Sequence, residues 1–327
     1  MSMTADQIVD RRRLRRKVTF WRVVGFLALF VAIVGVVIAV AGRDAFPGLR
    51  EPQIARIAIS GFIMDDRAQT ELIEDLAEND SVAGVIVAID STGGSTVGGE
   101  ALYESLRKLA DKKPTVATVG TVGASAAYMA AIATDHIVAR RTSITGSIGV
   151  IFQYPEVSEL LDKLGVKVED IKSAPLKAEP NPFKPTTPEA RAVIESLVRD
   201  SFNWFVEIVA ARRQLPWTRA MTLADGRIYT GHQALEAKLI DAIGGEEEAL
   251  AWLKSKGVDD TLPIRDWKPR GEGGVFSYAD AAVLWLSDKA GLSPFALPAE
   301  VAGKLLPPSL KLDGLLSVWQ GSAGGDE

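Results

Sequence analysis

The sequence predicts an α/β protein in which βα units surround a largely buried sheet. Short apolar runs, each long enough for one strand, alternate with segments of helical spacing. The run Gly84–Ile89 carries no polar side chain, as in strands that are covered on both faces. Of the 327 residues, 47% are apolar and 24% charged, a composition that fits one large packed domain or two ordinary ones.

The predicted elements follow one another in regular order. The first strand is Ile54–Ile59, and the helix after it, Gln69–Glu78, has apolar residues at helical spacing. A long helix is predicted over Pro188–Arg213 with proline in its first turn, and another begins after Gly231. Between the first and the long helix, the pattern predicts strands at Val82–Ile89, Thr115–Val119, His136–Ala139 and Ile144–Phe152, and helices at Gly99–Leu109 and Ser125–Ala133.

The chain divides into segments of different composition. Residues 1–22 are basic, residues 23–42 are apolar, and residues 43–52 form a short linker that contains proline and glycine. Residues 53–257 hold the α/β pattern. Residues 258–327 are rich in proline and glycine and are predicted to be a tail that packs on the core or on a neighbour, with a disordered end.

The apolar segment is predicted to be a transmembrane anchor. Val23 to Gly42 contains no charged residue, and as a helix it would span about 30 Å, the thickness of a bilayer core. A basic cluster precedes it, so the N-terminus is expected in the cytoplasm and the rest of the chain on the outer side. The alternative is a cleaved signal peptide, because Ala39-Val40-Ala41 fits a cleavage site, but the apolar core of such peptides is usually about 7–15 residues.

Charge and composition exclude several classes of function. Beyond residue 22 the chain has 30 basic residues (37 less seven) and 40 acidic ones (42 less two), which argues against a nucleic-acid partner. The absence of cysteine excludes disulfides, thiolate metal sites and thiol catalysis. With only two histidines we expect no metal centre, and no feature of the chain calls for a cofactor.

Ser125 is the candidate nucleophile, and it needs a base. It lies in the run GASAAYMAA at residues 123–131. His136 follows an aspartate at the start of a short strand, and His232 stands where a helix begins; both positions are typical of structural histidines. A lysine can act instead when burial lowers its pKa towards neutrality.

Three lysines are available in one proline-interrupted loop, IKSAPLKAEPNPFKP, and composition does not choose among them. They are Lys172, Lys177 and Lys184. An oxyanion hole would need backbone N–H groups, which two places offer. These are the glycine pair Gly93-Gly94 after a strand and the N-terminus of the helix that starts near Ser125.

Four stretches resemble the short form of the signal peptide peptidase A family, serine proteases of the Clp protease–crotonase superfamily. DSTGGS at 90–95 resembles the family's N-S-P-G-G-S turn, and GASAAY at 123–128 resembles its A-S-G-G-Y segment. TGSIGV at 145–150 matches the family strand, and ADGRIYTGHQA at 224–234 resembles the A-D-G-R-V-x-x-G-x-Q-A box. The sequence departs from the family at Asp90 and Thr92, and at Ala126 and Ala127, which stand in place of glycines.

The resemblance assigns roles to residues. It implies that Ser125 is the nucleophile and that Lys177 is the general base, since SAPLK at 173–177 resembles the family's S-G-x-x-K. It implies that the N–H groups of Gly94 and Ala126 form the oxyanion hole, and it places Ser147 near the lysine. The implied fold consists of Clp protease/crotonase-like repeated ββα units with a long helical extension, preceded by one N-terminal transmembrane helix.

The resemblance also implies a function. The expected activity is a membrane-anchored Ser-Lys endopeptidase that degrades remnant signal peptides. The expected assembly is a ring-like homo-oligomer at the bacterial inner membrane, with the catalytic domain on the outer side. Three alternatives stay open: a Ser-His esterase with His232 as base, a crotonase-like acyl-CoA enzyme, and a non-catalytic membrane scaffold on the same fold.

Overall fold

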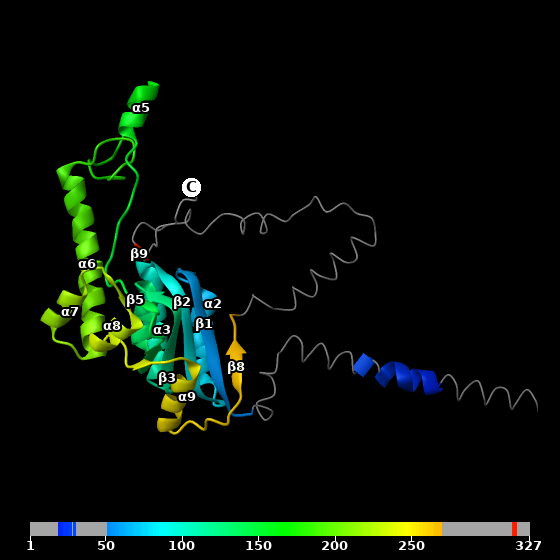
Figure 1. The fold of residues 1–327 in the computed structure, drawn as a ribbon. Helices are drawn as coiled ribbons and strands as arrows, with labels where there is room; N and C mark the ends of the chain where they lie inside the picture. Colours follow the sequence, from blue (N-terminus) through cyan, green and yellow to red (C-terminus); the bar gives the residue numbers. More distant parts are fainter. Residues whose placement is uncertain (1–18, 28, 31–50, 270–315, 319–327) are drawn as a thin grey trace, which may run out of the picture. The chain divides into compact units, whose positions relative to one another are not determined.

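A computed structural model describes residues 19–27, 29–30, 51–269 and 316–318 (Figure 1). Residues 19–27 and 29–30 are helical. Within the described ranges, no helix has both the length and the apolar character needed to cross a membrane. Residues 28 and 31–42 of the predicted anchor lie outside the described residues, as do most of the predicted linker and most of the predicted tail. The anchor therefore remains a prediction.

One mixed sheet forms the centre of the α/β part of the chain. Its main path has the order β6-β5-β3-β2-β1-β8, and β1 pairs in parallel with both β2 and β8. Strand β3 pairs with β4 along its first half and with β5 along its second half. The strands are β1 (Gln53–Ile63), β2 (Val82–Ser95), β3 (Thr115–Ala124), β4 (His136–Ala139), β5 (Ile144–Gly146), β6 (Ile228–Thr230), β7 (Ala242–Ile243), β8 (Ile264–Trp267) and β9 (Leu316–Val318).

Alternate residues of the central strands face two different apolar clusters. Val85 and Val87 of β2 pack in the larger cluster with residues of α2, α3, α4 and α6, whereas Ile86 packs in a smaller cluster with residues of α9. The sheet is thus covered on both faces, as its continuous apolar strands predict. The helices are α2 (Arg67–Glu78), α3 (Thr96–Ala110), α4 (Ala126–Ala133), α5 (Ser158–Leu164), α6 (Pro188–Arg213), α7 (Trp217–Leu223), α8 (Gly231–Glu236) and α9 (Glu246–Ser255).

Several predicted boundaries were wrong, chiefly next to the presumed site. The strand predicted over Thr115–Val119 continues to Ala124, directly before Ser125. The strand predicted over Val82–Ile89 continues to Ser95, because β1 extends alongside it and pairs with the glycines at 93 and 94. The strand predicted over Ile144–Phe152 ends at Gly146, where positive φ angles at Gly146 (83°) and Ser147 (49°) turn the chain away. In addition, β8 adds an edge strand to the sheet from within the segment read as a tail.

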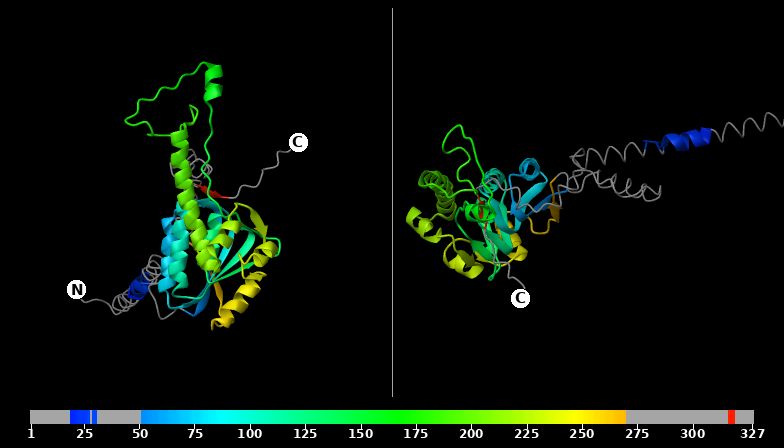
Figure 2. Two further views of the ribbon diagram at one scale, coloured as in Figure 1. Left: turned by 90° about the vertical axis from the view of Figure 1, so that its left-hand side faces the viewer. Right: turned by 90° about the horizontal axis from the view of Figure 1, so that it is seen from above.

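An arm projects from the sheet and its covering helices (Figures 1 and 2). We define the arm as residues 152–187, which include α5 and lead into the N-terminal end of α6. None of its residues is buried as a whole. Figure 2 shows α6 running from the arm down along the α/β part of the chain. Sequence periodicity missed α5 because this short helix has no buried face.

Candidate active site

Ser125 stands at the junction between β3 and α4 in a strained conformation. Its φ of 60° and ψ of −121° are rarely adopted by residues other than glycine, and such a conformation costs about 1–3 kcal/mol. Its N–H donates to Gly146 O at 2.9 Å, which ties the junction to β5. Only 1% of the residue is exposed. A serine held on a sharp strand-to-helix turn has the geometry of a nucleophile elbow.

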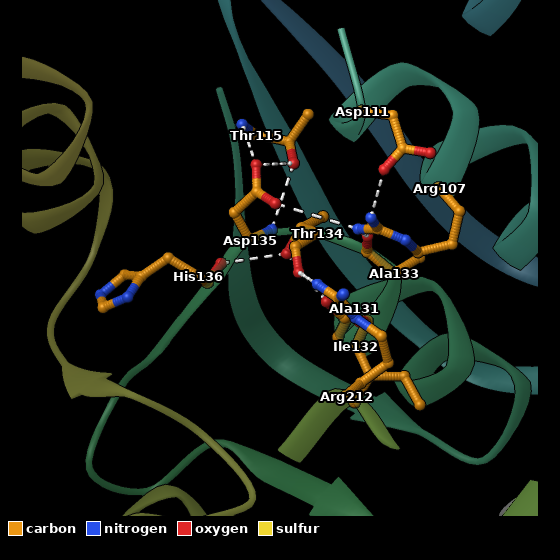
Figure 3. Close-up of polar contacts among 10 residues, drawn as sticks. All are labelled: Arg107, Asp111, Thr115, Ala131, Ile132, Ala133, Thr134, Asp135, His136 and Arg212. Carbon is orange, nitrogen blue, oxygen red and sulfur yellow. Dashed lines mark hydrogen bonds and ion pairs between the residues drawn. The ribbon is translucent and has the colours of Figure 1, made fainter. Parts of the chain in front are cut away.

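The helix that follows Ser125 is wholly apolar and is held at its far end by two arginines (Figure 3). Arg107 of α3 donates to Ala133 O at 2.7 Å, and Arg212 of α6 donates to Ile132 O at 2.9 Å and to Thr134 O at 3.0 Å. These cations satisfy carbonyls that have no partner within the helix and favour its negative end. The two arginines thereby fix the direction of α4.

The N-terminal end of α4 begins directly after Ser125. The first turn of a helix has N–H groups without intrahelical partners, and Ala126 is the first helical residue. A Cβ on Gly99 of α3 would lie 3.0 Å from Ala126 Cβ, so the start of α3 packs directly on the start of α4. Since Gly94 lies just before α3, this packing brings the two segments predicted to form the oxyanion hole close together.

The Gly93-Gly94 segment is held in place without the family's proline. A Cβ on Gly94 would lie 1.8 Å from Ile63 O, so only glycine fits there. Ser91 Oγ donates to Gly61 O at 2.6 Å and accepts from Gly93 N–H at 3.1 Å. These contacts explain how the segment keeps its shape despite Thr92.

Asp90 also departs from the family, and it links two strands. Its Oδ1 accepts a hydrogen bond from Val122 N–H at 3.1 Å, which joins the end of β2 to β3 just before the Ser125 junction. No sequence pattern indicates this role, because the two residues meet only through the pairing of the strands.

Positive φ angles gather on the predicted site segments. Among the described residues, five other than glycine have positive φ. Two of these are Ser125 and Ser147, and a third is Ala178, which follows Lys177 directly. Strained backbone persists only where surrounding contacts enforce it, and it is frequent at active sites. This pattern marks both the serine and the lysine segment.

The three loop lysines have different surroundings. Lys172 Nζ lies 2.7 Å from Asp170 and also pairs with Glu179, while Lys184 Nζ lies 2.6 Å from Glu179. The hydrogen bonds to Asp170 and then to Glu179 raise the pKa of Lys172, so it is held as an ammonium. Within the described residues, the exposed Lys177 amine makes no hydrogen bond or ion pair.

Neither histidine is brought to Ser125. His136 pairs with Val116 near the start of β3, nine residues before Ser125, which is about 30 Å along a strand. Its ring stacks on Trp252, and burial lowers its pKa. His232 N–H donates to Arg141 O, before β5 begins, and its ring lies 3.6 Å from Glu236. These contacts are structural.

The structure brings together Ser125, Ala126 and the Gly94 segment, but it leaves Lys177 on the exposed arm. Across the described residues, no group of three or more His, Asp or Glu side chains is arranged to hold a metal ion. Sequence reasoning missed the arginine pair at the end of α4 and the carboxylates that bind Lys172 and Lys184. Each depends on tertiary contacts that leave no pattern in the sequence.

Known proteins resemble this chain over most of its length. The profile of Peptidase family S49 matches residues 107–259, which include Ser125 and Lys177. A Synechocystis protein named as a candidate protease is 36% identical over 250 residues, covering 74% of this chain and 88% of that protein. The chain belongs to peptidase family S49. An Enterococcus faecium protein named as a candidate signal peptide peptidase SppA is 32% identical over 259 residues, 74% of this chain and 72% of the relative.

These S49 relatives confirm the resemblance to the signal peptide peptidase A family. Protease 4 of Haemophilus influenzae is 29% identical over 61% of this chain but only 34% of its own length. A solved structure of a mutant of the membrane-bound stomatin-specific protease 1510-N is 15% identical, with a TM-score of 0.46 over 68% of this chain and 100% of that chain. Membership of S49 identifies the chain as a serine peptidase, and its mixed α/β sheet is consistent with a Clp protease/crotonase-like fold.

Proposed function

We propose that this S49 peptidase is a membrane-anchored endopeptidase that uses a Ser125–Lys177 dyad. The observation that carries the proposal is the strained backbone of Ser125 at the start of a helix whose far end is clamped. Strained backbone of this kind is frequent at active sites. Lys177 is proposed as the base because Lys172 and Lys184 are both held in ion pairs.

The dyad would work by general base catalysis. Neutral Lys177 takes the Ser125 hydroxyl proton as Oγ attacks the peptide carbonyl carbon. The N–H groups of Gly94 and Ala126 would stabilise the oxyanion. The Lys177 ammonium then gives its proton to the leaving amine as the C–N bond breaks. Water, deprotonated by the same lysine, hydrolyses the acyl-enzyme and releases Ser125.

We infer that the base comes from a neighbouring subunit of a ring-like homo-oligomer. The arm that carries Lys177 exposes many apolar side chains, which monomeric proteins seldom gather in one place. They include Leu160 (57% exposed), Leu164 (67%), Val168 (49%), Ile171 (105%) and Leu176 (47%). Packing on a second copy would bury these side chains and remove the Lys177 amine from water. Desolvation favours the neutral amine that a base requires.

The proposed substrates are remnant signal peptides and similar apolar peptides. The support is the strand pairing of β9, in which Leu316–Val318 runs antiparallel to Gly93–Ser95 of β2. An extended segment can therefore bind by backbone hydrogen bonds next to Gly94, the mode by which a strand is added to a sheet edge. The proposed anchor, residues 23–42, would hold this site at the outer face of a bacterial inner membrane, where peptides leave the bilayer.

Mixing two inactive variants tests both the dyad and the shared site. Ser125→Ala and Lys177→Ala should each lower kcat/KM for an apolar peptide by about 10⁴-fold or more. If subunits share the site, co-assembled S125A and K177A chains should regain activity, because some sites then pair an intact serine with an intact lysine. Full activity of either variant alone would refute the dyad, and no recovery in the mixture would refute the shared site.

A further inference from the structure

We propose that Glu179 is a positioning residue for the Lys177 base. Glu179 and Asp170 form ion pairs with Lys172 and Lys184, and these pairs hold residues 172–184 as a closed loop. Lys177 lies within this loop and is the lysine that it presents to Ser125. The inference rests on the proposed Ser125–Lys177 dyad and adds to it the group that selects and places the base.

The Glu179 side chain is buried, although it lies in the exposed arm. Only 3% of its side chain is exposed, and Lys172 beside it is 14% exposed, although no residue of the arm is buried as a whole. A buried charge is tolerated when it is paired, and removing one partner of such a pair is costly. Glu179 Oε1 receives both Lys172 and Lys184, the latter at 2.6 Å.

The ion pairs tie together residues on both sides of Lys177. Lys172 precedes it and Lys184 follows it, and both reach the same carboxylate oxygen of Glu179. Asp170 reinforces the closure, at 2.7 Å from Lys172 and 3.7 Å from Lys184. A segment without an apolar core of its own is thereby held as a closed loop.

Within this loop the backbone turns tightly at Lys177. Its N–H donates to Ala174 O at 3.1 Å, and Glu179 N–H donates to Leu176 O at 3.3 Å. Ala178, between them, has a φ of 59°, a strained value that nearby contacts must enforce. Glu179 is the next residue along, so its ion pairs with Lys172 and Lys184 fix the backbone directly after the Lys177 turn.

The cluster also removes competing bases. Two ammonium groups face two carboxylates, so their charges balance. Lys172 and Lys184 are each engaged by Asp170 and Glu179, so both amines are already bound to carboxylates of the arm. Of the three loop lysines, Lys177 is therefore the one left to serve as base.

Replacing the carboxylate while keeping its shape tests the inference in the full-length oligomer. Glu179→Gln should lower kcat for an apolar peptide about 10- to 100-fold, since a displacement of about 1 Å in a reacting group has effects of this size. KM should change by less than about twofold, because the proposed substrate contacts lie on β2 and not on the arm. The matched control is Glu169→Gln, an exposed glutamate of the same arm, which should behave as wild type.

A mutant cycle separates positioning from a general loss of structure. If Glu179 acts through the two lysines, K172Q/E179Q/K184Q should lose no more activity than Glu179→Gln alone, and Glu179→Asp should restore part of kcat. The inference would be overturned if the triple variant lost much more activity than Glu179→Gln alone, or if Glu179→Gln kept the wild-type kcat. Lys177→Ala is measured in parallel: if it stays active the dyad itself fails, whereas an inactive Lys177→Ala with a fully active Glu179→Gln refutes the positioning role alone.

Discussion

The segment that carries Ser125 and the arm that carries Lys177 are built in opposite ways. All eight residues of α4 are buried, and apolar packing together with hydrogen bonds from Arg107 and Arg212 to its last carbonyls holds it against α3, α6 and the sheet. The arm has no residue that is buried as a whole, and a cluster of four charged side chains closes its central loop. One half of the proposed dyad is thus completed within a single chain, and the other half is exposed for contact with a neighbour.

The difference shows what each half requires. A nucleophile must be held in one strained geometry, which a dense apolar core can enforce because interiors are closely packed. A base supplied to another subunit must stand on the surface, where apolar packing becomes available only after assembly. Ion pairs inside the arm can shape it before that contact forms. Variants that weaken one kind of support should therefore leave the other intact.

The largest effect is expected at Gly94, where the neighbouring backbone leaves no space for a Cβ atom. Gly94→Ala would place a Cβ 1.8 Å from Ile63 O, so β1 or β2 must move. We expect the free energy of unfolding to fall by about 3 kcal/mol and activity by about 100-fold, because the displaced N–H can no longer face the oxyanion. Thermal unfolding and peptide hydrolysis measure both.

Gly149→Ala is the control for Gly94→Ala. The nearest atom that its Cβ would meet, Gly226 Cα, is 3.6 Å away, an ordinary contact. Near wild-type stability is expected there. Equal losses in the two variants would show that the tight approach at Gly94 is not the cause.

A smaller effect is expected at the clamped end of α4. Arg212→Met would leave the carbonyls of Ile132 and Thr134 without their guanidinium donor, at a cost of about 1–3 kcal/mol. Labelling of Ser125 by a fluorophosphonate should slow, because the helix that presents it loses a fixed point. Arg199→Met, an exposed position on the same helix, should label at the wild-type rate. Identical rates in the two variants would contradict a role for the clamp.

The smallest effect is a local response of the arm to acid. Hydrogen bonds from Lys172 and then Lys184 lower the pKa of Glu179 in the folded arm. A carboxyl group with a lowered pKa adds stability above its unfolded value, about 4.3, and that stability is lost as the pH falls through the folded value. The protection factors of the arm amides, which compare exchange with the intrinsic rate at the same pH, should therefore fall below about pH 4, while amides of β2 and β3 stay protected.

Glu179→Gln should reduce this acid response of the arm, with the remainder coming from Asp170, whose pKa is lowered by its hydrogen bond from Lys172. The substitution leaves the packing of the sheet untouched, so exchange in β2 and β3 serves as the internal reference. Arm amides that remain as protected at pH 3 as at pH 7 in the wild-type chain would show that the ion pairs do not hold the arm.

Sequence reasoning succeeded where one local pattern determines the structure. The bounds of α6, Pro188–Arg213, were predicted correctly, because proline marks its first turn and the residues that follow keep a helical pattern up to its end. The strand predicted through Phe152 was wrong because apolar residues continued beyond Gly146 while the backbone turned. The end of β2 was placed too early because its glycines resemble a turn, and only the close approach of β1 makes them part of a strand.

The site was predictable only in part for the same reason. Ser125 stood out as a hydroxyl in an apolar run, but its strain and its link to Gly146 depend on β5. Residue composition could not rank the three loop lysines, and only the resemblance of SAPLK at 173–177 to the family motif selected Lys177. Their ion pairs with Asp170 and Glu179 distinguish them, since these partners meet only after the loop folds back on itself.

Helix α6 connects the segments that carry the two residues of the proposed dyad. Its 26 residues extend about 39 Å and join the arm at one end, while Arg212 in its last turn grips the helix that begins after Ser125. If a docking neighbour tilted the arm, α6 would tilt with it, and the hydrogen bonds of Arg212 would pass that movement to the carbonyls at the far end of α4. The orientation of the arm would in this way be linked to the position of α4, while Ser125 keeps its elbow geometry within a single chain.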